Sequence, residues 1–145
     1  MLVQQILKTK ASDAVVTVPS STLVADAAQV LADKGIGTVV VSDDGGATAA
    51  GILSERDIVR ELARSGGGCL DKAVSEYMTR ALVTCTRQDK SDAILSQMTE
   101  GRFRHMPVVE DGKLVGIVTL GDVVKAQLTE LSMEKDALQG MIMGH

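Results

Sequence analysis

Two short polar motifs carry the chemistry that this sequence can support. The segment Gly51-Ile-Leu-Ser-Glu-Arg-Asp57 returns at an offset of 65 positions as Gly116-Ile-Val-Thr-Leu-Gly-Asp122. In both copies a hydroxyl residue precedes an expected helix, and a carboxylate follows three residues later on the same helix face. The free N–H groups and the dipole at a helix start favour anionic or hydroxyl-rich ligands. A carboxylate there can accept both hydroxyls of a vicinal diol, as an acidic residue does for ribose in dinucleotide-binding folds.

The same spacing has a purely structural interpretation. Ser or Thr with an acidic residue three positions later is also the pattern of a helix capping box. One copy alone favours capping. The two roles are compatible, so both stay open at this stage.

The two motifs belong to a longer internal repeat. Upstream of them the copies match at an offset of 67, at the following pairs: Thr17 and Thr84, Leu31 and Met98, Ile36 and Phe103, Val41 and Val108. The change of offset falls in one Gly-containing loop, 42–50, which is longer than its counterpart 109–115. Length changes in homologous units concentrate in such turns. The chain therefore contains two copies of one structural unit.

Each copy has the same expected order of elements, β-α-β-β-α, because apolar residues recur at helical spacing between short β-rich runs. Ser54 and Thr119 are both good N-cap residues for the last helix of their copy. The predicted strands are 15–18, 38–42 and 50–53 in the first copy, and 82–85, 106–110 and 114–118 in the second. The predicted helices are about 22–34 and from 54 onward, and about 89–100 and from 119 onward. The fold class is α/β (α+β).

Three segments lie outside the repeated core. The Gly-rich connector 64–69 is expected to be flexible or turned. Short lead-in helices are expected at 3–7 and 74–78, one before each copy. The stretch 120–143 predicts a helix that extends past the repeat, although a frayed tail that folds back is an equal alternative. The apolar residues that this helix offers to a partner are Leu128, Leu131, Leu138 and Met141. The expected division is 1–66, 67–130 and a helical extension over 131–145.

Composition argues against several classes of protein. The 145 residues are 45% hydrophobic, which is typical of a globular protein. The net charge of −4 and the presence of only Tyr77 and Phe103 as aromatic residues argue against nucleic-acid binding. The absence of an apolar run of about 18 residues predicts no membrane span, and the start resembles no secretory signal. Two isolated cysteines, Cys69 and Cys85, fit a cytoplasmic protein without a metal site.

The repeated motif, placed after a predicted β-hairpin and opening a helix, strongly resembles the CBS domain, named after cystathionine β-synthase. Two tandem copies resemble the CBS pair, or Bateman module, over about residues 3–130. The segment from Arg104 to Gly116 is similar to the stand-alone bacterial form of this family. The resemblance implies a pseudo-two-fold pair with two clefts between the repeats, assembled as a disc-shaped homodimer.

The resemblance also assigns residues to each cleft. In the second-repeat site it places Asp122 on the ribose, Thr119 and Gly121 near the ribose phosphate, Met106 and Pro107 against the base, and Arg104 and His105 toward the phosphates. The opposite wall of that site is Thr17, Val18, Pro19, Ile36 and Gly37. The first-repeat site uses Asp57, Ser54 and Arg56, with a wall of Thr84, Cys85, Thr86 and Phe103.

The two copies differ in one respect that bears on the ligand. The second copy has Arg104-His105 where the first has Gly37-Thr38. Arginine is well suited to phosphate recognition, so we expect one strong site and one weaker or differently selective site. A solvated basic turn is the alternative interpretation of this cluster, which also includes Arg102.

These features predict a regulatory module that binds an adenine nucleotide, AMP, ADP, ATP or NAD, and shifts conformation or partner binding on occupancy. A homodimer and an unidentified protein target are the expected partners. No catalysis is expected, because His105 is the only internal histidine and no nucleophile elbow, Walker loop or zinc-protease motif is present. A structural dimer without a ligand is the alternative, and a small hydrolase is less favoured.

Overall fold

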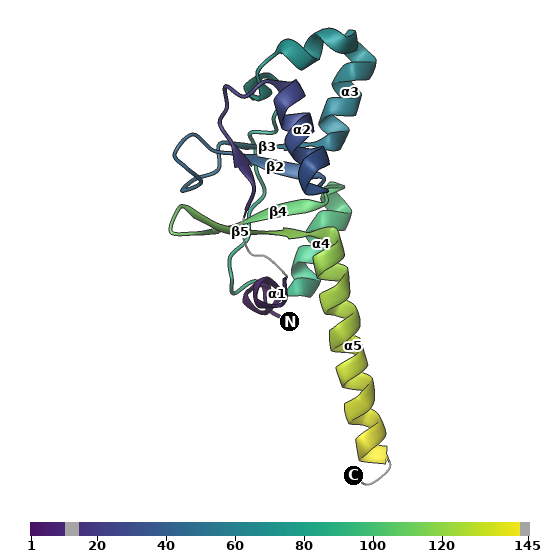
Figure 1. Cartoon of the computed structure of the whole chain (residues 1–145). Helices are drawn as coiled ribbons and strands as arrows, with labels where there is room; N and C mark the ends of the chain where they lie inside the picture. The colour runs from purple at the N-terminus through teal and green to yellow at the C-terminus, as the bar shows by residue number, and fades with distance from the viewer. Residues whose placement is uncertain (11–14, 143–145) are drawn as a thin grey trace. The chain divides into compact units, whose positions relative to one another are not determined.

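The computed structural model describes residues 1–10 and 15–142 (Figure 1). The elements in chain order are α1 (Val3–Thr9), β1 (Thr17–Val18), α2 (Val24–Lys34), β2 (Thr38–Val41), β3 (Gly51–Ser54), α3 (Glu55–Ser65), η1 (Gly66–Asp71), η2 (Val74–Glu76), α4 (Ser91–Gly101), β4 (His105–Glu110), β5 (Lys113–Thr119) and α5 (Leu120–Ile142). The expected mixed α/β class and the β-hairpin before each motif are confirmed.

The described chain divides into two compact units. We call residues 15–83 and 109–115 the α3 unit, and residues 1–10, 84–108 and 116–142 the α5 unit. The units therefore do not coincide with the sequence repeats, because the hairpin tip 109–115 and the two lead-in segments lie with the opposite copy. Each unit is described by itself below.

The α3 unit is built on a three-stranded sheet in the order β1-β2-β3. β1 runs parallel to β2, with Thr17 opposite Val40, and β2 runs antiparallel to β3, with Val39 opposite Leu53. All four residues of β2 are buried, as expected for an apolar strand covered on both faces. α2 contacts β2, and α3 contacts both β3 and α2. The apolar core joins these elements to the second lead-in segment through Val74 and Met78.

The α5 unit contains the second copy's helices and the first lead-in helix. α4 and α5 pack against each other, and α1 packs against α5. Val3 and Ile6 of α1 are buried, and the Val3 N–H donates to the carbonyl of Asp89 at 2.9 Å. Buried Ser91, the first residue of α4, donates through Oγ to Oε1 of Gln127 on α5 at 2.7 Å.

The first glycine of each motif makes room for a lead-in segment. A Cβ added to Gly51 would lie 2.6 Å from Sδ of Met78 and 2.9 Å from the carbonyl oxygen of Thr79. A Cβ added to Gly116 would lie 3.0 Å from Cδ2 of Leu7. The lead-in before the second copy thus packs on the first motif, and the lead-in before the first copy packs on the second motif.

Some elements differ from the sequence-based expectation. The expected strand 82–85 is reduced to a single parallel bridge between Cys85 and Val108 of β4. The Cys85 N–H donates to the carbonyl of Pro107 at 3.0 Å. The second lead-in is the short 3₁₀ helix η2 rather than an α-helix. The Gly-rich connector continues α3 to Ser65 and then turns as the 3₁₀ helix η1, which buries Cys69.

The long last helix is confirmed. α5 runs without a break from Leu120 to Ile142 over 23 residues, so the described part does not fold back. Only Val123 and Ala126 of this helix are buried. No helix within residues 1–10 and 15–142 combines the length and hydropathy needed to cross a bilayer.

Candidate functional site

Both motif hydroxyls cap the helix that follows them. The Asp57 N–H donates to Oγ of Ser54 at 3.2 Å, and the Ser54 N–H donates back to Oδ2 of Asp57 at 2.9 Å. The Asp122 N–H donates to Oγ1 of Thr119 at 3.1 Å, and the Thr119 N–H donates to Oδ2 of Asp122 at 2.9 Å. The capping interpretation is confirmed in both copies. Capping occupies one carboxylate oxygen of each aspartate.

Asp122 also has a cationic partner that the sequence did not reveal. The Lys10 ammonium lies 2.9 Å from Oδ2 of Asp122 and donates to the carbonyl of Ile117 at 2.9 Å. Both side chains of the ion pair are about a fifth to a quarter exposed, at 21% and 24%. Oδ1 of Asp122 accepts no hydrogen bond from the described residues, so it can receive a ligand hydroxyl.

The electrostatics of Asp122 follow from these contacts. Burial alone raises the pKa of its carboxyl group, because a charge is costly to desolvate. The backbone hydrogen bond from Thr119 and the interaction with Lys10 outweigh that effect and hold the pKa of Asp122 below its ordinary value of 3.8. The carboxylate is therefore ionised at neutral pH and can accept hydrogen bonds.

Asp57 has a different environment. Its Oδ1 accepts from Nη1 of Arg60, one turn along α3, at 3.2 Å, and its Oδ2 also accepts from Oγ of Ser54 at 3.0 Å. The Arg60 side chain is 53% exposed, so water screens this ion pair. Both oxygens of Asp57 thus have partners inside the α3 unit, and Arg56 is exposed beside them.

One backbone hydrogen bond joins each junction to the residue just before the first strand of its hairpin, β2 or β4. The Leu120 N–H donates to the carbonyl of Arg104 at 2.8 Å, and the Glu55 N–H donates to the carbonyl of Gly37 at 2.9 Å. Arg104 and Gly37 therefore occupy equivalent places, each directly beside a capped helix start. Arg104 is exposed and His105 is half-buried at the start of β4. The Arg104-His105 pair has no cationic counterpart at Gly37-Thr38.

The α5 unit thus brings together the ligand motif of the second-repeat site, namely Thr119, Gly121, Asp122, Arg104, His105, Met106 and Pro107. Met106 is fully buried, and its contact with a base stays a prediction. The wall residues assigned to the second-repeat site lie in the α3 unit: Thr17, Val18, Pro19, Ile36 and Gly37. The wall residues assigned to the first-repeat site lie in the α5 unit: Thr84, Thr86 and Phe103. Their pairing with the motifs also stays a prediction.

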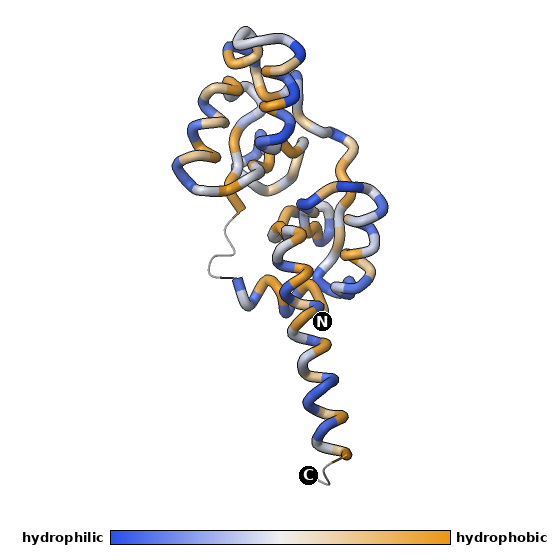
Figure 2. The backbone as a smooth tube through the Cα atoms, turned by 90° about the vertical axis from the view of Figure 1, so that its right-hand side faces the viewer, coloured by the Kyte–Doolittle hydropathy of each residue, from blue (hydrophilic) through white to orange (hydrophobic). Residues whose placement is uncertain are grey.

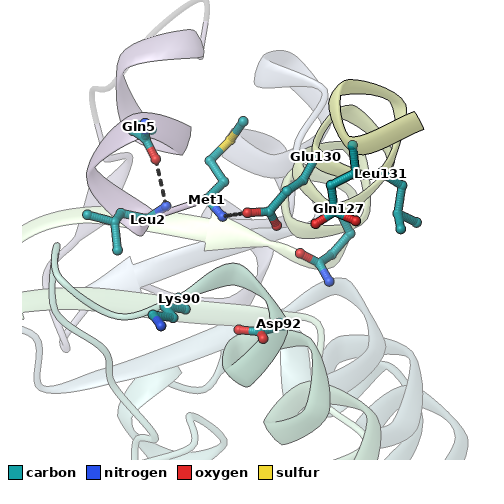
Figure 3. A pocket seen from close by; sticks show the side chains of 9 residues that line it. Met1, Leu2, Gln5, Lys90, Asp92, Gln127, Glu130 and Leu131 are labelled. Carbon is teal, nitrogen blue, oxygen red and sulfur yellow. Dashed lines mark hydrogen bonds and ion pairs between the residues drawn. The ribbon is translucent and has the colours of Figure 1, made fainter. Parts of the chain in front are cut away.

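A separate pocket of about 450 Å³ lies in the α5 unit, between α1, the start of α4 and the middle of α5 (Figure 3). Its lining residues are Met1, Leu2, Gln5, Lys90, Asp92, Gln127, Glu130, Leu131 and Glu134. None of these was assigned to a nucleotide site. Three carboxylates against one lysine side chain make the pocket unsuited to a phosphorylated ligand.

Metal and cysteine chemistry receive no support from the described residues. Among residues 1–10 and 15–142, no three His, Cys, Asp or Glu side chains are grouped so as to hold a metal ion. Cys69 and Cys85 are both buried and free, and they lie in different units.

Comparison with known proteins agrees with the repeat and the fold. The CBS domain model matches residues 3–64 and 74–129. The chain is 34% identical over 122 residues to the CBS domain-containing protein CBSX3, mitochondrial, of Arabidopsis thaliana, covering 82% of this chain and 59% of that protein. It spans only 22% of a second Arabidopsis relative, CBSCBSPB3.

Solved structures give the same result. The CBS-domain containing protein ATU1752 from Agrobacterium tumefaciens is 42% identical, with a TM-score of 0.83 over 88% of this chain and 99% of that one. The CBS domain pair of MJ0100, in complex with 5-methylthioadenosine and S-adenosyl-L-methionine, is 28% identical, with a TM-score of 0.77 over 90% and 98%. PAE2072 from Pyrobaculum aerophilum, complexed with AMP, is 25% identical, with a TM-score of 0.78 over 92% and 99%. The chain belongs to the CBS domain family and carries two CBS domains in tandem.

Proposed function

We propose that this CBS-domain pair is a regulatory module that binds an adenosine-containing nucleotide, with its stronger site at Asp122. The observation that carries this proposal is the Leu120–Arg104 hydrogen bond, which sets a cationic segment beside a capped helix start. A diol acceptor, a helix N-terminus and phosphate-binding cations then lie within one compact unit. The similar proteins MJ0100 and PAE2072 are named as complexes with adenosine compounds.

Each part of the ligand meets a chemically matched group. Oδ1 of Asp122 accepts a ribose hydroxyl, and the start of α5 stabilises negative charge near it. Arg104 and His105 bind the phosphates, because charge-assisted hydrogen bonds to phosphate are stronger than neutral ones. Lys10 and the Thr119 N–H both contact Oδ2 of Asp122, which leaves Oδ1 for the ligand.

The site at Asp57 is proposed as the weaker or differently selective one. Both oxygens of Asp57 already accept hydrogen bonds from Ser54 and Arg60. Gly37, the counterpart of Arg104, has no side chain to reach a phosphate. Arg56 is the nearest cation in the sequence that could compensate.

Ligand binding would regulate rather than catalyse. A nucleotide that binds one conformation better shifts the population toward it. A nucleotide at a free concentration of 100 times its dissociation constant adds about 2.7 kcal/mol to the free energy of unfolding. The signal is passed to an unidentified protein target through a homodimer, and the two buried free cysteines suit a reducing compartment such as the cytoplasm.

Calorimetric titration with AMP tests the site assignment. The Asp122→Asn variant keeps an acceptor for the Thr119 cap but loses the charge, so we expect loss of the tighter binding phase. The matched Asp57→Asn variant should keep that phase. An unchanged tight phase in Asp122→Asn contradicts the assignment.

A wider ligand series separates the nucleotide proposal from its structural alternative. AMP, ADP, ATP and NAD should each be tested for a rise in melting temperature, with S-adenosylmethionine as the non-phosphorylated comparison. Native mass spectrometry of the purified protein would identify a co-purified nucleotide. A melting temperature indifferent to all five compounds supports a structural dimer without a ligand.

A further inference from the structure

The exposed part of α5 carries an ordered apolar stripe. From Val124 onward, positions spaced alternately by four and three residues form what we call the α5 seam: Val124, Leu128, Leu131, Lys135, Leu138 and Ile142. The apolar members are exposed, Leu131 by 60% and Leu138 by 59%. Figure 2 shows hydrophobic and hydrophilic residues alternating along this helix. A sustained spacing of 3.5 residues is that of a coiled-coil seam.

The seam differs from the buried face of α5, and it borders the pocket beside α1 at Leu131. That inner face is formed by Val123 and Ala126, which are buried. The family match ends at residue 129, so most of the seam lies beyond the CBS fold itself. A helical segment of this length is marginal in water unless its apolar face is packed. The exposed apolar residues of the α5 seam therefore require a second helix to pack against them.

We propose that the α5 seam pairs two copies of this chain through antiparallel α5 helices. A two-fold axis passing at the level of Met133 places Leu128 opposite Leu138 of the second copy. It also places Val124 opposite Ile142, and Leu131 opposite Lys135. An isologous contact of this kind uses the same patch on both copies and closes as a dimer.

Charge complementarity selects the second copy and the antiparallel direction. In this register the Lys135 ammonium lies over Leu131 of the second copy, with Glu130 and Glu134 on the adjacent turns. Glu130, Leu131 and Glu134 line the acidic pocket of Figure 3, in which Lys90 is the one lysine among the lining side chains. Glu130 already contacts the Met1 amino group through Oε1, which leaves its other oxygen and Glu134 for Lys135. A parallel pair would instead place the two Lys135 ammonium groups against each other.

This inference deepens the proposed homodimer by naming its surface, and its test uses no nucleotide. Sedimentation equilibrium of the full chain should give twice the monomer mass of 15.2 kDa. The Leu131→Glu/Leu138→Glu double variant should give the monomer mass. Met133→Glu is the matched control, because Met133 is 64% exposed but lies off the seam. A monomeric wild type, a dimeric double variant or a monomeric Met133→Glu variant overturns the proposal.

Disulfide cross-linking tests the direction. In the antiparallel register, Leu128→Cys and Leu138→Cys proteins should cross-link only when mixed, because equal positions lie roughly 15 Å apart along the axis. The native cysteines are buried, so the wild type is the blank. Cross-linking of either variant alone, or of neither alone nor mixed, overturns the antiparallel pair. Because nucleotide binding at Asp122 is measured separately, failure here leaves that proposal standing.

Discussion

The two strand-to-helix junctions of this protein share a backbone and differ in charge. Each has a glycine, a hydroxyl cap, an aspartate and the same hydrogen bond to the residue just before the first strand of its hairpin. At Asp122 the carboxylate is held by a half-buried lysine from a distant segment, whereas at Asp57 it is held by an exposed arginine on its own helix. The two copies therefore share the backbone hydrogen bonds of the junction, and they differ in the charged side chains that contact its aspartate.

The largest predicted effect is a loss of stability on substitution of Gly51, which should exceed the loss at Gly116. Gly51→Ala sets a Cβ against the backbone carbonyl of Thr79, which pairs with β3 and cannot yield easily. We expect a loss of about 2–3 kcal/mol of unfolding free energy from this overpacking, measured by urea denaturation. Gly116→Ala meets only the end of the flexible Leu7 side chain and should lose less than about 1 kcal/mol. Equal losses would show that the two lead-in contacts are alike.

The next effect concerns phosphate binding. Arg104→Ala removes the cation that has no counterpart at Gly37, so AMP binding should weaken roughly 10- to 100-fold, the worth of one charged hydrogen bond. Adenosine binding should change little, because it lacks the phosphate. Arg60→Ala, at the other junction, is the control. Calorimetric titration with both ligands makes the comparison, and an equal loss for adenosine would place Arg104 outside phosphate recognition.

Lys10 should matter for stability more than Arg60 does. Lys10→Met removes both the ion pair with Asp122 and the hydrogen bond to Ile117, and we expect a loss of about 1 kcal/mol at neutral pH. Arg60→Ala breaks an exposed pair and should cost less than about 0.5 kcal/mol.

The pH dependence of the Lys10 effect gives an internal check. The pKa of Asp122 is lowered in the folded state, so its stabilisation is present above the unfolded pKa and is lost as pH falls through the folded value. The wild type and Lys10→Met should therefore converge in strong acid. A difference that persists unchanged there would assign the effect of Lys10 to packing alone.

The smallest effect should come from the ends of α2 and α4. Gly35 closes α2 in a left-handed conformation with φ of 62°, and Arg102 closes α4 in the same way with φ of 56°. A non-glycine residue is strained there, so Arg102→Gly should raise the unfolding free energy by about 0.5 kcal/mol, after the larger entropy loss of glycine. A small loss of stability instead would mean that the Arg102 side chain stabilises the fold.

The features of the fold that depend on the spacing of nearby residues could be predicted from the sequence. The repeat, most of the order of its elements and both helix caps could be predicted, because capping residues and apolar periodicity act over a few positions. The long last helix was one of two equal alternatives. Lys10 could not be predicted, since its contact with Asp122 spans more than a hundred residues and has no local pattern. The left-handed Arg102 could not either, because an arginine carries no turn signal. The reduction of the expected strand 82–85 to a single bridge at Cys85 could not either, since the pairing of this segment with β4 has no local pattern.

The exchange of lead-in segments has a consequence for how the chain acquires its fold. The partners of α1 in the α5 unit are distant in the sequence, because α1 contacts Asp89 and the helix that begins at Leu120. The α3 unit likewise takes residues 109–115 from the second copy. Contacts of such long sequence separation slow folding, because the loops between them must close first. Each unit therefore draws residues from both copies, and its contacts are complete only when segments of both copies are present.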